Sequence, residues 1–386
     1  MNKVITVLAI IGLFLVLVPG CMEEPNPVGA RLLPPSDLLK LDTTTVVATK
    51  SATERVVPNT STPLSILVGK TSDYESWALL RFTPIPDTLL FVNVIDAKLD
   101  LRVNYHFGDS LAPFSLDVHK VLTSWGGDSL TIDSLNVAGL YEPTPNTSFA
   151  GSAIGDTATI SIPLDTAMVR QWLDSPLDTV ATNWGVLLKP TNSSVIKGFA
   201  TSISSNASFR PQLVARYQRA GSTRIDTVRV SGSSEAFAAF AENTSWLGDS
   251  TRMYIHNGIA SRGMVDFDIS SLPAKSTIHK AVLEVTLDAA LSRFNSHTRD
   301  SLFAFFVGSD GVFTSLAAVS EPATTNGQKV YRIAVTQFVQ LWSRSDEPQR
   351  IALAGFAEDR ALDSFVLYGA TTLFRPKLII TYSPVQ

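Results

Sequence analysis

The distribution of apolar positions predicts a chain built from short β-strands. Residues 99–103 and 282–287 alternate apolar and polar side chains, as strands with one buried and one solvated face do. Two further runs, Leu213–Tyr217 and Leu378–Tyr382, each begin near a proline and are expected to be closing strands. Gly, Asp, Asn, Ser and Pro clusters separate the runs, which is turn chemistry. The pattern therefore predicts an all-β fold of the jelly-roll-like β-sandwich type.

Few segments have a helical pattern. Leu164–Leu173 and Val335–Trp342 are each expected to form a short helix that ends near a tryptophan. Trp172 and Trp342 are predicted to pack in the core, since a buried indole removes a large apolar area from water. Residues 234–242 have helical composition at a place where a strand is expected, so both interpretations stay open.

Much of the chain repeats once. Several matches occur in the same order, and the copies agree best at their ends, where Phe209–Tyr217 resembles Phe374–Tyr382. The other matches are Leu41–Thr43 with Ile225–Thr227, Asn59–Ser61 with Asn243–Ser245, Phe82 with Phe267, Ala97–Leu99 with Ala281–Leu283, and Val169–Trp172 with Val339–Trp342. We therefore expect two tandem domains of like fold, residues 41–218 and 222–384. The first copy is longer, mostly between about Trp125 and Ala158.

The N-terminus has the pattern of an export and anchoring signal. Lys3 precedes a nearly continuous apolar run, Val4–Val18, which is short for a membrane-spanning helix and fits a signal peptide. Leu17–Cys21 resembles the bacterial lipobox, which implies lipidation of Cys21 after removal of residues 1–20. Several acyl chains on one residue anchor a protein stably. The proline-rich residues 21–40 would form a tether.

Composition excludes several classes of function. Hydrophobic residues make up 45% of the 386 residues and the net charge is −4, so the chain is neither disordered nor basic enough for broad nucleic-acid binding. The single cysteine excludes disulfide frameworks and CxxC metal sites, and the five histidines lack short zinc spacings. Because no nucleophile elbow or phosphate loop occurs, we expect a non-catalytic protein; paired carboxylates of a polysaccharide lyase or hydrolase are the remaining catalytic alternative.

The ordered motifs resemble a known family. They are Leu80-Arg81-Phe82, Ile95–Leu101, Val121–Trp125, Val169–Leu173, Asn183–Leu188 and Arg210–Leu213. Together they look like the DNRLRE-type domain, which is similar to an alginate-binding family of carbohydrate-binding modules. The second copy lacks the Trp125 and Asn183-Trp184-Gly185 signatures. The resemblance implies a β-sandwich and a polysaccharide ligand, acidic as alginate is.

The ligand-binding residues are expected among aromatic side chains without a counterpart in the other copy. These are Tyr74, Trp77, Tyr105, Trp125, Tyr141, Trp246 and Tyr254. Their rings would stack on the apolar faces of sugars, whereas the alternative interpretation is packing beneath loops. Lys70, Arg102 and Lys120 are nearby cations for an acidic polymer. No cofactor is expected. One interpretation of Asp109, Asp128, Asp133 and Asp156 is that they bind a structural calcium ion; the alternative is that they serve only as turn residues.

The sequence as a whole thus predicts a lipid-anchored protein of the bacterial cell envelope. The expected location is the outer membrane, facing either the periplasm or the cell surface. The expected role is non-catalytic polysaccharide binding, and the alternative is a structural or adhesive spacer that contacts other proteins. Clustering of the unrepeated aromatic residues on one face would favour the binding role.

Overall fold

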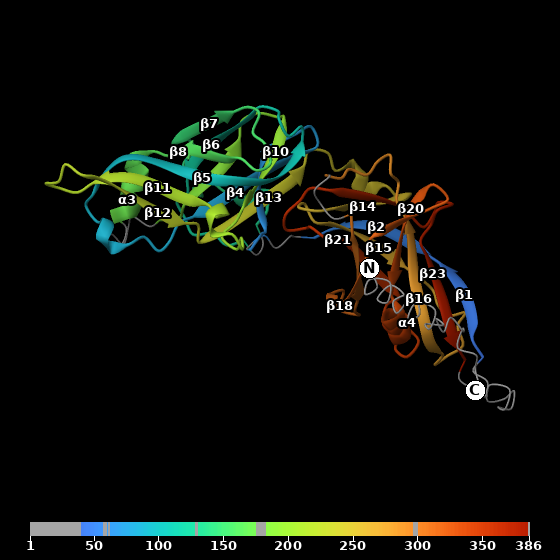
Figure 1. Cartoon of the computed structure of the whole chain (residues 1–386). Helices are drawn as coiled ribbons and strands as arrows, with labels where there is room; N and C mark the ends of the chain where they lie inside the picture. Colours follow the sequence, from blue (N-terminus) through green and yellow to red (C-terminus); the bar gives the residue numbers. More distant parts are fainter. Residues whose placement is uncertain are drawn as a thin grey trace, which may run out of the picture. The chain divides into compact units, whose positions relative to one another are not determined.

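The computed structural model describes residues 40–56, 60, 62–127, 130–174, 183–295 and 300–384. The signal peptide, Cys21 and nearly all of the tether lie outside these residues. Residues from Asp42 onward form one compact unit, which contains two β-sandwiches (Figure 1). The all-β, sandwich-type prediction is confirmed.

The first sandwich consists of a continuous stretch of chain. Its elements are β3 (Ser65–Lys70), β4 (Tyr74–Arg81), η2 (Asp87–Leu89), β5 (Asn93–Gly108), β6 (Phe114–Lys120), α2 (Ile132–Leu135), β7 (Thr147–Gly151), β8 (Thr159–Pro163), α3 (Thr166–Asp174), β9 (Val186–Pro190), β10 (Val195–Ala200), η3 (Ala207–Phe209), β11 (Gln212–Gln218), β12 (Ile225–Ser231) and β13 (Ser234–Ala241).

The second sandwich takes its strands from both ends of the chain. Its elements are β1 (Asp42–Val47), β2 (Lys50–Arg55), η4 (Ser245–Gly248), β14 (Arg252–His256), β15 (Ser261–Asp266), β16 (Thr277–Thr286), β17 (Leu302–Val307), β18 (Phe313–Ser320), β19 (Pro322–Thr325), β20 (Gln328–Ala334), α4 (Thr336–Trp342), β21 (Arg350–Gly355), β22 (Ser364–Tyr368) and β23 (Lys377–Ser383).

The long strand β5 joins the two layers of the first sandwich. Its first half pairs with β11 and β8, and its second half pairs with β10. The second layer continues as β10-β3-β4-β9-β6-β7, with β13 added beside β4. Buried side chains from both layers, such as Leu99 and Leu188, meet in one core. In the second sandwich the layers are β1-β23-β16-β20-β19 and β18-β17-β21-β15-β14-β22, with β2 beside β15.

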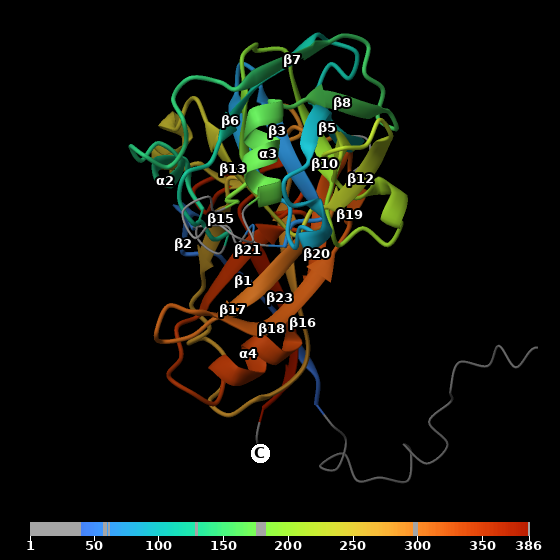
Figure 2. The ribbon, with the colours of Figure 1, turned by 90° about the vertical axis from the view of Figure 1, so that its left-hand side faces the viewer.

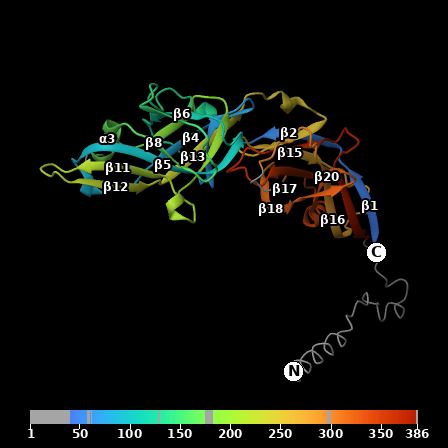
Figure 3. The same ribbon diagram turned by 45° about the horizontal axis from the view of Figure 1, so that its top comes forward.

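Strand pairing crosses the boundary between the two repeats. β1 and β2, from the start of the first repeat, pair with β23 and β15; β12 and β13, from the start of the second repeat, pair with β11 and β4. Figure 1 shows β1 beside β23 although they lie at opposite ends of the chain, and Figure 3 shows β2 beside β15. The first sandwich is therefore an insertion between β2 and β14 of the second.

The two predicted helices form where expected. α3 lies against the first sandwich (Figure 2), and α4 occupies the equivalent place in the second. Trp172 and Trp342 belong to the two hydrophobic cores, at 1% and 4% exposed, so the core prediction is confirmed. Residues 234–241 form strand β13, which decides between the two interpretations of that segment.

Residues 121–127 and 130–141 of the first copy, which we call the covering segment, lie over the outer face of its own sheet. Val121, Leu130 and Leu135 are buried there against Trp77 and Leu79 of β4. Trp77 and Leu79 point away from the sandwich core because side chains alternate along a strand, and Ala78 and Leu80 point into it.

Candidate functional site

Three of the predicted ligand-binding aromatics lie together. Tyr74 begins β4, Trp246 lies in η4 and Tyr254 lies in β14, and all three surround His256. The His256 ring centroid is 4.6 Å from that of Trp246, 6.0 Å from that of Tyr74 and 6.4 Å from that of Tyr254. Phe107 adds an edge-on contact with Tyr74 at 5.2 Å. We call Tyr74, Trp246, Tyr254 and His256 the aromatic cluster.

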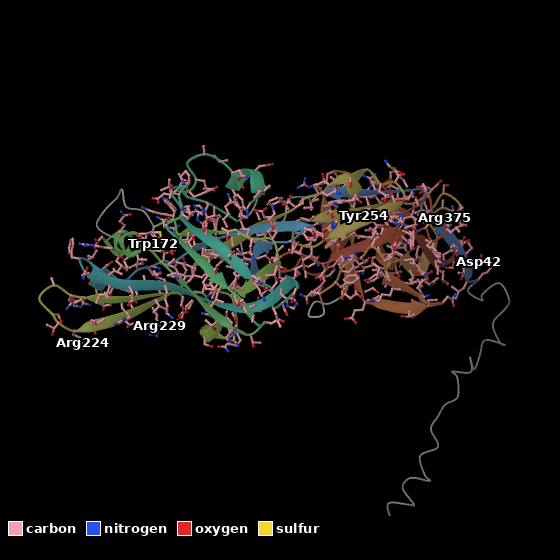
Figure 4. All side chains as sticks on the ribbon, turned by 90° about the horizontal axis from the view of Figure 1, so that it is seen from above. Asp42, Trp172, Arg224, Arg229, Tyr254 and Arg375 are labelled. Carbon is pink, nitrogen blue, oxygen red and sulfur yellow. The ribbon has the colours of Figure 1, made fainter. Side chains whose placement is uncertain are left out.

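The aromatic cluster borders an open cavity of about 240 Å³. Polar and apolar groups of both sandwiches line it, and Figure 4 labels Tyr254 among them. The lining residues are Ser72, Asp73, Tyr74, Ala241, Asn243, Trp246, Tyr254, His256, Leu291, Arg293, Ser364 and Val366. Ring faces combined with a few hydrogen-bonding groups are the usual lining of a small-molecule site.

Local hydrogen bonds orient the Trp246 indole. The Asn243 side chain accepts a hydrogen bond from the Ser245 amide at 2.8 Å, which starts the short turn η4. The indole Nε1 then donates to the Asn243 carbonyl oxygen at 2.7 Å. Trp246 is half-buried and packs against the core of the first sandwich, so one side of the ring is supported and the rest stays accessible.

Asp249 holds the Tyr254 hydroxyl. The phenol donates to Asp249 Oδ2 at 3.0 Å, while the Thr251 amide and hydroxyl donate to Oδ1 at 2.8 and 2.6 Å. Burial acts to raise the Asp249 pKa, but these hydrogen bonds outweigh it and the net pKa is lowered. Burial, and then the Asp249 carboxylate, raise the pKa of Tyr254, so its hydroxyl remains a neutral donor.

His256 is neutral at ordinary pH. Its backbone amide donates to Ser261 Oγ at 3.0 Å, and that hydroxyl donates its only hydrogen to the Tyr254 carbonyl. His256 Nδ1, 2.7 Å from the same oxygen, must therefore be the donor, which leaves the lone pair on Nε2. Burial lowers the pKa of His256 to about 4. Burial also raises the pKa of Tyr74 to about 12.

Arg293 supplies the cavity with positive charge. Its Nη1 donates to the carbonyl oxygens of Ala290 and Ser292, both at 3.0 Å, and its side chain is exposed. No carboxylate in the described part of the chain forms an ion pair with it. By contrast, the cation nearest in sequence to Tyr74, Lys70, contacts Glu75 and Glu242 at 2.5 and 2.7 Å. Arg293 is thus the cation best placed to meet an anionic group.

Trp77, Trp125 and Tyr141 lie in another cluster, in and beneath the covering segment of the first sandwich. Trp77 is 4% exposed, its Nε1 donates to Glu75 at 2.6 Å, and the Lys189 ammonium lies 4.2 Å from its ring centre. Trp125 Nε1 donates to the Trp184 carbonyl at 2.8 Å. The Tyr141 ring packs 5.1 Å from His119.

Tyr105 lies in neither cluster. It is buried, and its hydroxyl accepts a hydrogen bond from the Leu362 amide at 2.9 Å. This bond joins the first sandwich to the second. Burial raises the Tyr105 pKa well above its ordinary value.

Four of the remaining predicted polar groups have internal partners, whereas Asp133 is exposed in the first turn of α2. Arg102 lies over the Phe209 ring, and Lys120 donates to Gln171. Asp109 accepts from the Leu111 amide, and Asp156 contacts His106 Nδ1 at 2.7 Å. Among the described residues, no three His, Cys, Asp or Glu side chains gather in a metal-binding group; Asp128 lies outside the described residues.

Sequence reasoning missed His256, Asn243, Arg293 and Ser364. His256 could have been found, because it lies two residues after Tyr254 and therefore faces the same side of a strand. Arg293 and Ser364 come from distant segments that only the fold brings to the cavity. Within the described residues, no helix has both the length and the apolar character needed to cross a bilayer.

Neither a protein-family model nor any curated protein matches this chain. The geometry of the aromatic cluster and the sequence patterns therefore carry the functional argument.

Proposed function

We propose that this chain is a non-catalytic lipoprotein of the bacterial cell envelope that binds polysaccharide at the aromatic cluster. Lipidation of Cys21 would attach it to the membrane, and the resemblance to DNRLRE-type domains supports a glycan ligand. The carrying observation is that Tyr74, Trp246 and Tyr254, selected from sequence as unrepeated aromatics, line one cavity. The cavity opens to solvent, as an extended polymer requires.

The chemistry of the cavity suits a sugar residue. The ring of Trp246 offers an apolar face to pyranose C–H groups, while Asn243 and Ser364 offer hydrogen bonds to hydroxyl groups. The Arg293 guanidinium offers two parallel donors to a carboxylate, which is the geometry a uronic acid needs. This supports an acidic, alginate-like polymer.

The polar groups beside the cavity favour binding over catalysis. Asp249 already accepts three hydrogen bonds and has a lowered pKa, so it does not resemble a general acid held protonated. His256 is neutral and hydrogen-bonded through Nδ1. A proton-transfer role would need a group whose pKa lies near neutral pH.

Retention of residues 22–386 on immobilised alginate and on a neutral polysaccharide, with and without calcium, tests the proposal. Trp246→Ala is expected to weaken alginate binding about 2- to 12-fold, the loss of one aromatic contact of about 0.5–1.5 kcal/mol. Arg293→Gln is expected to weaken binding of alginate more than that of the neutral polymer.

Trp125→Ala is the matched control. Like Trp246, Trp125 is half-buried and donates its indole N–H to a backbone carbonyl, but it lies in the covered cluster. Equal binding losses for both tryptophans would contradict a site at the aromatic cluster. A folded wild-type protein that no polymer retains would instead favour the spacer or protein-binding role.

A further inference from the structure

The two sandwiches are closed by equivalent strand pairs of very different origin. In the first sandwich β12 and β13 follow directly after β11, with which β12 pairs. In the second sandwich β1 and β2 come from the start of the chain, and the whole first sandwich separates them from β14. The hydrogen bond between Thr43 and Thr381 spans 338 residues.

The two strand pairs have the same register against their partner strands in the two sandwiches. Asp42 lies opposite Tyr382, just as its repeat equivalent Asp226 lies opposite Tyr217. On the other layer, Ala52 lies opposite Met264 and Ala236 lies opposite Leu79, again at equivalent positions. The edges formed by β23 and β15 are therefore complementary to this strand pair in register.

The N-terminal pair is held mainly by backbone hydrogen bonds. Of residues 42–55, only Val46 and Ala48 are buried. The corresponding pair in the first sandwich buries more, including Val230, Ala236 and Phe237. β1 is also the edge strand of its sheet. Its release therefore breaks the hydrogen bonds with one neighbouring strand, β23, and exposes little of the hydrophobic core.

In the sequence, only residues 57–59 separate the end of the N-terminal pair at Val56 from Thr60. The Val56 amide still donates to Ala260 of the second sandwich at 2.8 Å, and the Thr60 hydroxyl already donates to Phe237 of the first at 2.8 Å. A short connection between exchangeable elements favours exchange between molecules.

We propose that β1 and β2 are an exchangeable closing element, and that two copies of this chain associate by reciprocal exchange. β1 and β2 of one copy would pair with β23 and β15 of the other, and the reverse pairing would complete the dimer. Each sandwich in the dimer would still contain all of its strands, so the exchange would lose none of the hydrogen bonds between strands. The proposal does not depend on a glycan ligand.

Crosslinking between chains tests the exchange. Residues 22–386 contain every described strand and no cysteine, since Cys21 is the only one. The Thr43 and Thr381 hydroxyls are 3.3 Å apart, so Thr43→Cys and Thr381→Cys place facing thiols on β1 and β23. The two single variants, one bearing a mass tag, are unfolded together, refolded at high concentration and oxidised. We expect a 43–381 disulfide between chains, identified by mass spectrometry.

The first sandwich provides the matched control. Thr227 faces Arg216 at the equivalent register, but within a local hairpin. A mixture of Thr227→Cys and Arg216→Cys should give severalfold less crosslinked heterodimer than the Thr43 and Thr381 mixture. Equal yields from the two mixtures would overturn the proposal. So would failure of a Thr43→Cys, Thr381→Cys double variant to form the 43–381 disulfide at all, either within one chain or between two, because β1 would then not pair with β23.

Discussion

At the scale of single residues, protonation of His256 makes the stability of the folded protein depend on pH. Its pKa of about 4 lies below the ordinary value of 6.5 because burial disfavours the imidazolium. The unfolded chain therefore binds more protons than the folded chain between these two values. The contribution of neutral His256 to the free energy of unfolding is present at neutral pH and is lost as the pH falls from about 6.5 to 4.

We predict that the free energy of unfolding falls by about 3 kcal/mol more in the wild type than in His256→Gln between pH 7 and pH 4. Urea denaturation of both proteins at a series of pH values measures the difference. Parallel pH profiles would show that His256 is not held neutral by burial. Carboxyl groups whose pKa is lowered in the folded protein, such as Glu284 beside Lys377 and Arg332, also make stability depend on pH, but they are common to both proteins and cancel in the comparison.

Gly185, in the Asn183-Trp184-Gly185 signature, lies where the backbone conformation and the surrounding space favour glycine. Its φ is +86°, and a Cβ there would overlap the Leu80 carbonyl oxygen. We predict that Gly185→Ala lowers the free energy of unfolding by about 1–3 kcal/mol or more. Gly126→Ala, at a position with open space around the Cβ, is the control and should change stability little. Equal effects in denaturant titrations would contradict the steric argument.

At the scale of elements, the covering segment explains why the predicted aromatics separate into two groups. Tyr74 and Trp77 lie on the same strand three positions apart, and because side chains alternate along a strand they face opposite sides of the sheet. Trp77 faces the covering segment, where Leu135 is fully buried.

We predict that Leu135→Ala destabilises the protein by about 2–5 kcal/mol, as deletions from packed cores do. It should also loosen the cover, so that tryptophan fluorescence shifts to longer wavelength at denaturant concentrations where the wild type is unchanged. The exposed Val137, two residues further on, supplies the control Val137→Ala. A loss of stability as large for Val137→Ala would argue against this role for the segment.

Elements were predictable from sequence where local pattern decides structure. Alternation marked the strands at residues 99–103 and 282–287, and the repeat marked the helices that carry Trp172 and Trp342. Residues 234–241 were ambiguous because alanine-rich composition favours a helix, whereas pairing with β4 makes them a strand. The partner of β1 was unpredictable for a related reason: β11 and β23 have similar sequences, and only the three-dimensional arrangement selects between them.

At the scale of the whole molecule, the strand pairing predicts which sandwich each repeat stabilises. Val46 and its repeat equivalent Val230 are both buried, on β1 and β12. Val46→Asp should reduce hydrogen-exchange protection in β16 and β23, and Val230→Asp should reduce it in β5 and β11, because an unpaired carboxylate is costly to bury. Mass spectrometry of peptides from these strands would measure both. The opposite assignment would mean that each repeat closes its own sandwich.

The insertion of one sandwich into the other also sets an order of assembly during synthesis of the chain. As the chain emerges from its N-terminus, β3 to β13 can complete the first sandwich from contiguous residues, whereas β2 must wait for β15, and β1 must wait for β23, the last described strand. Until β23 has been synthesised, β1 has no partner strand, and the backbone groups of an unpaired strand can pair with another chain. A premature stop before residue 377 would thus leave a finished first sandwich carrying a free β1 strand at its N-terminal side.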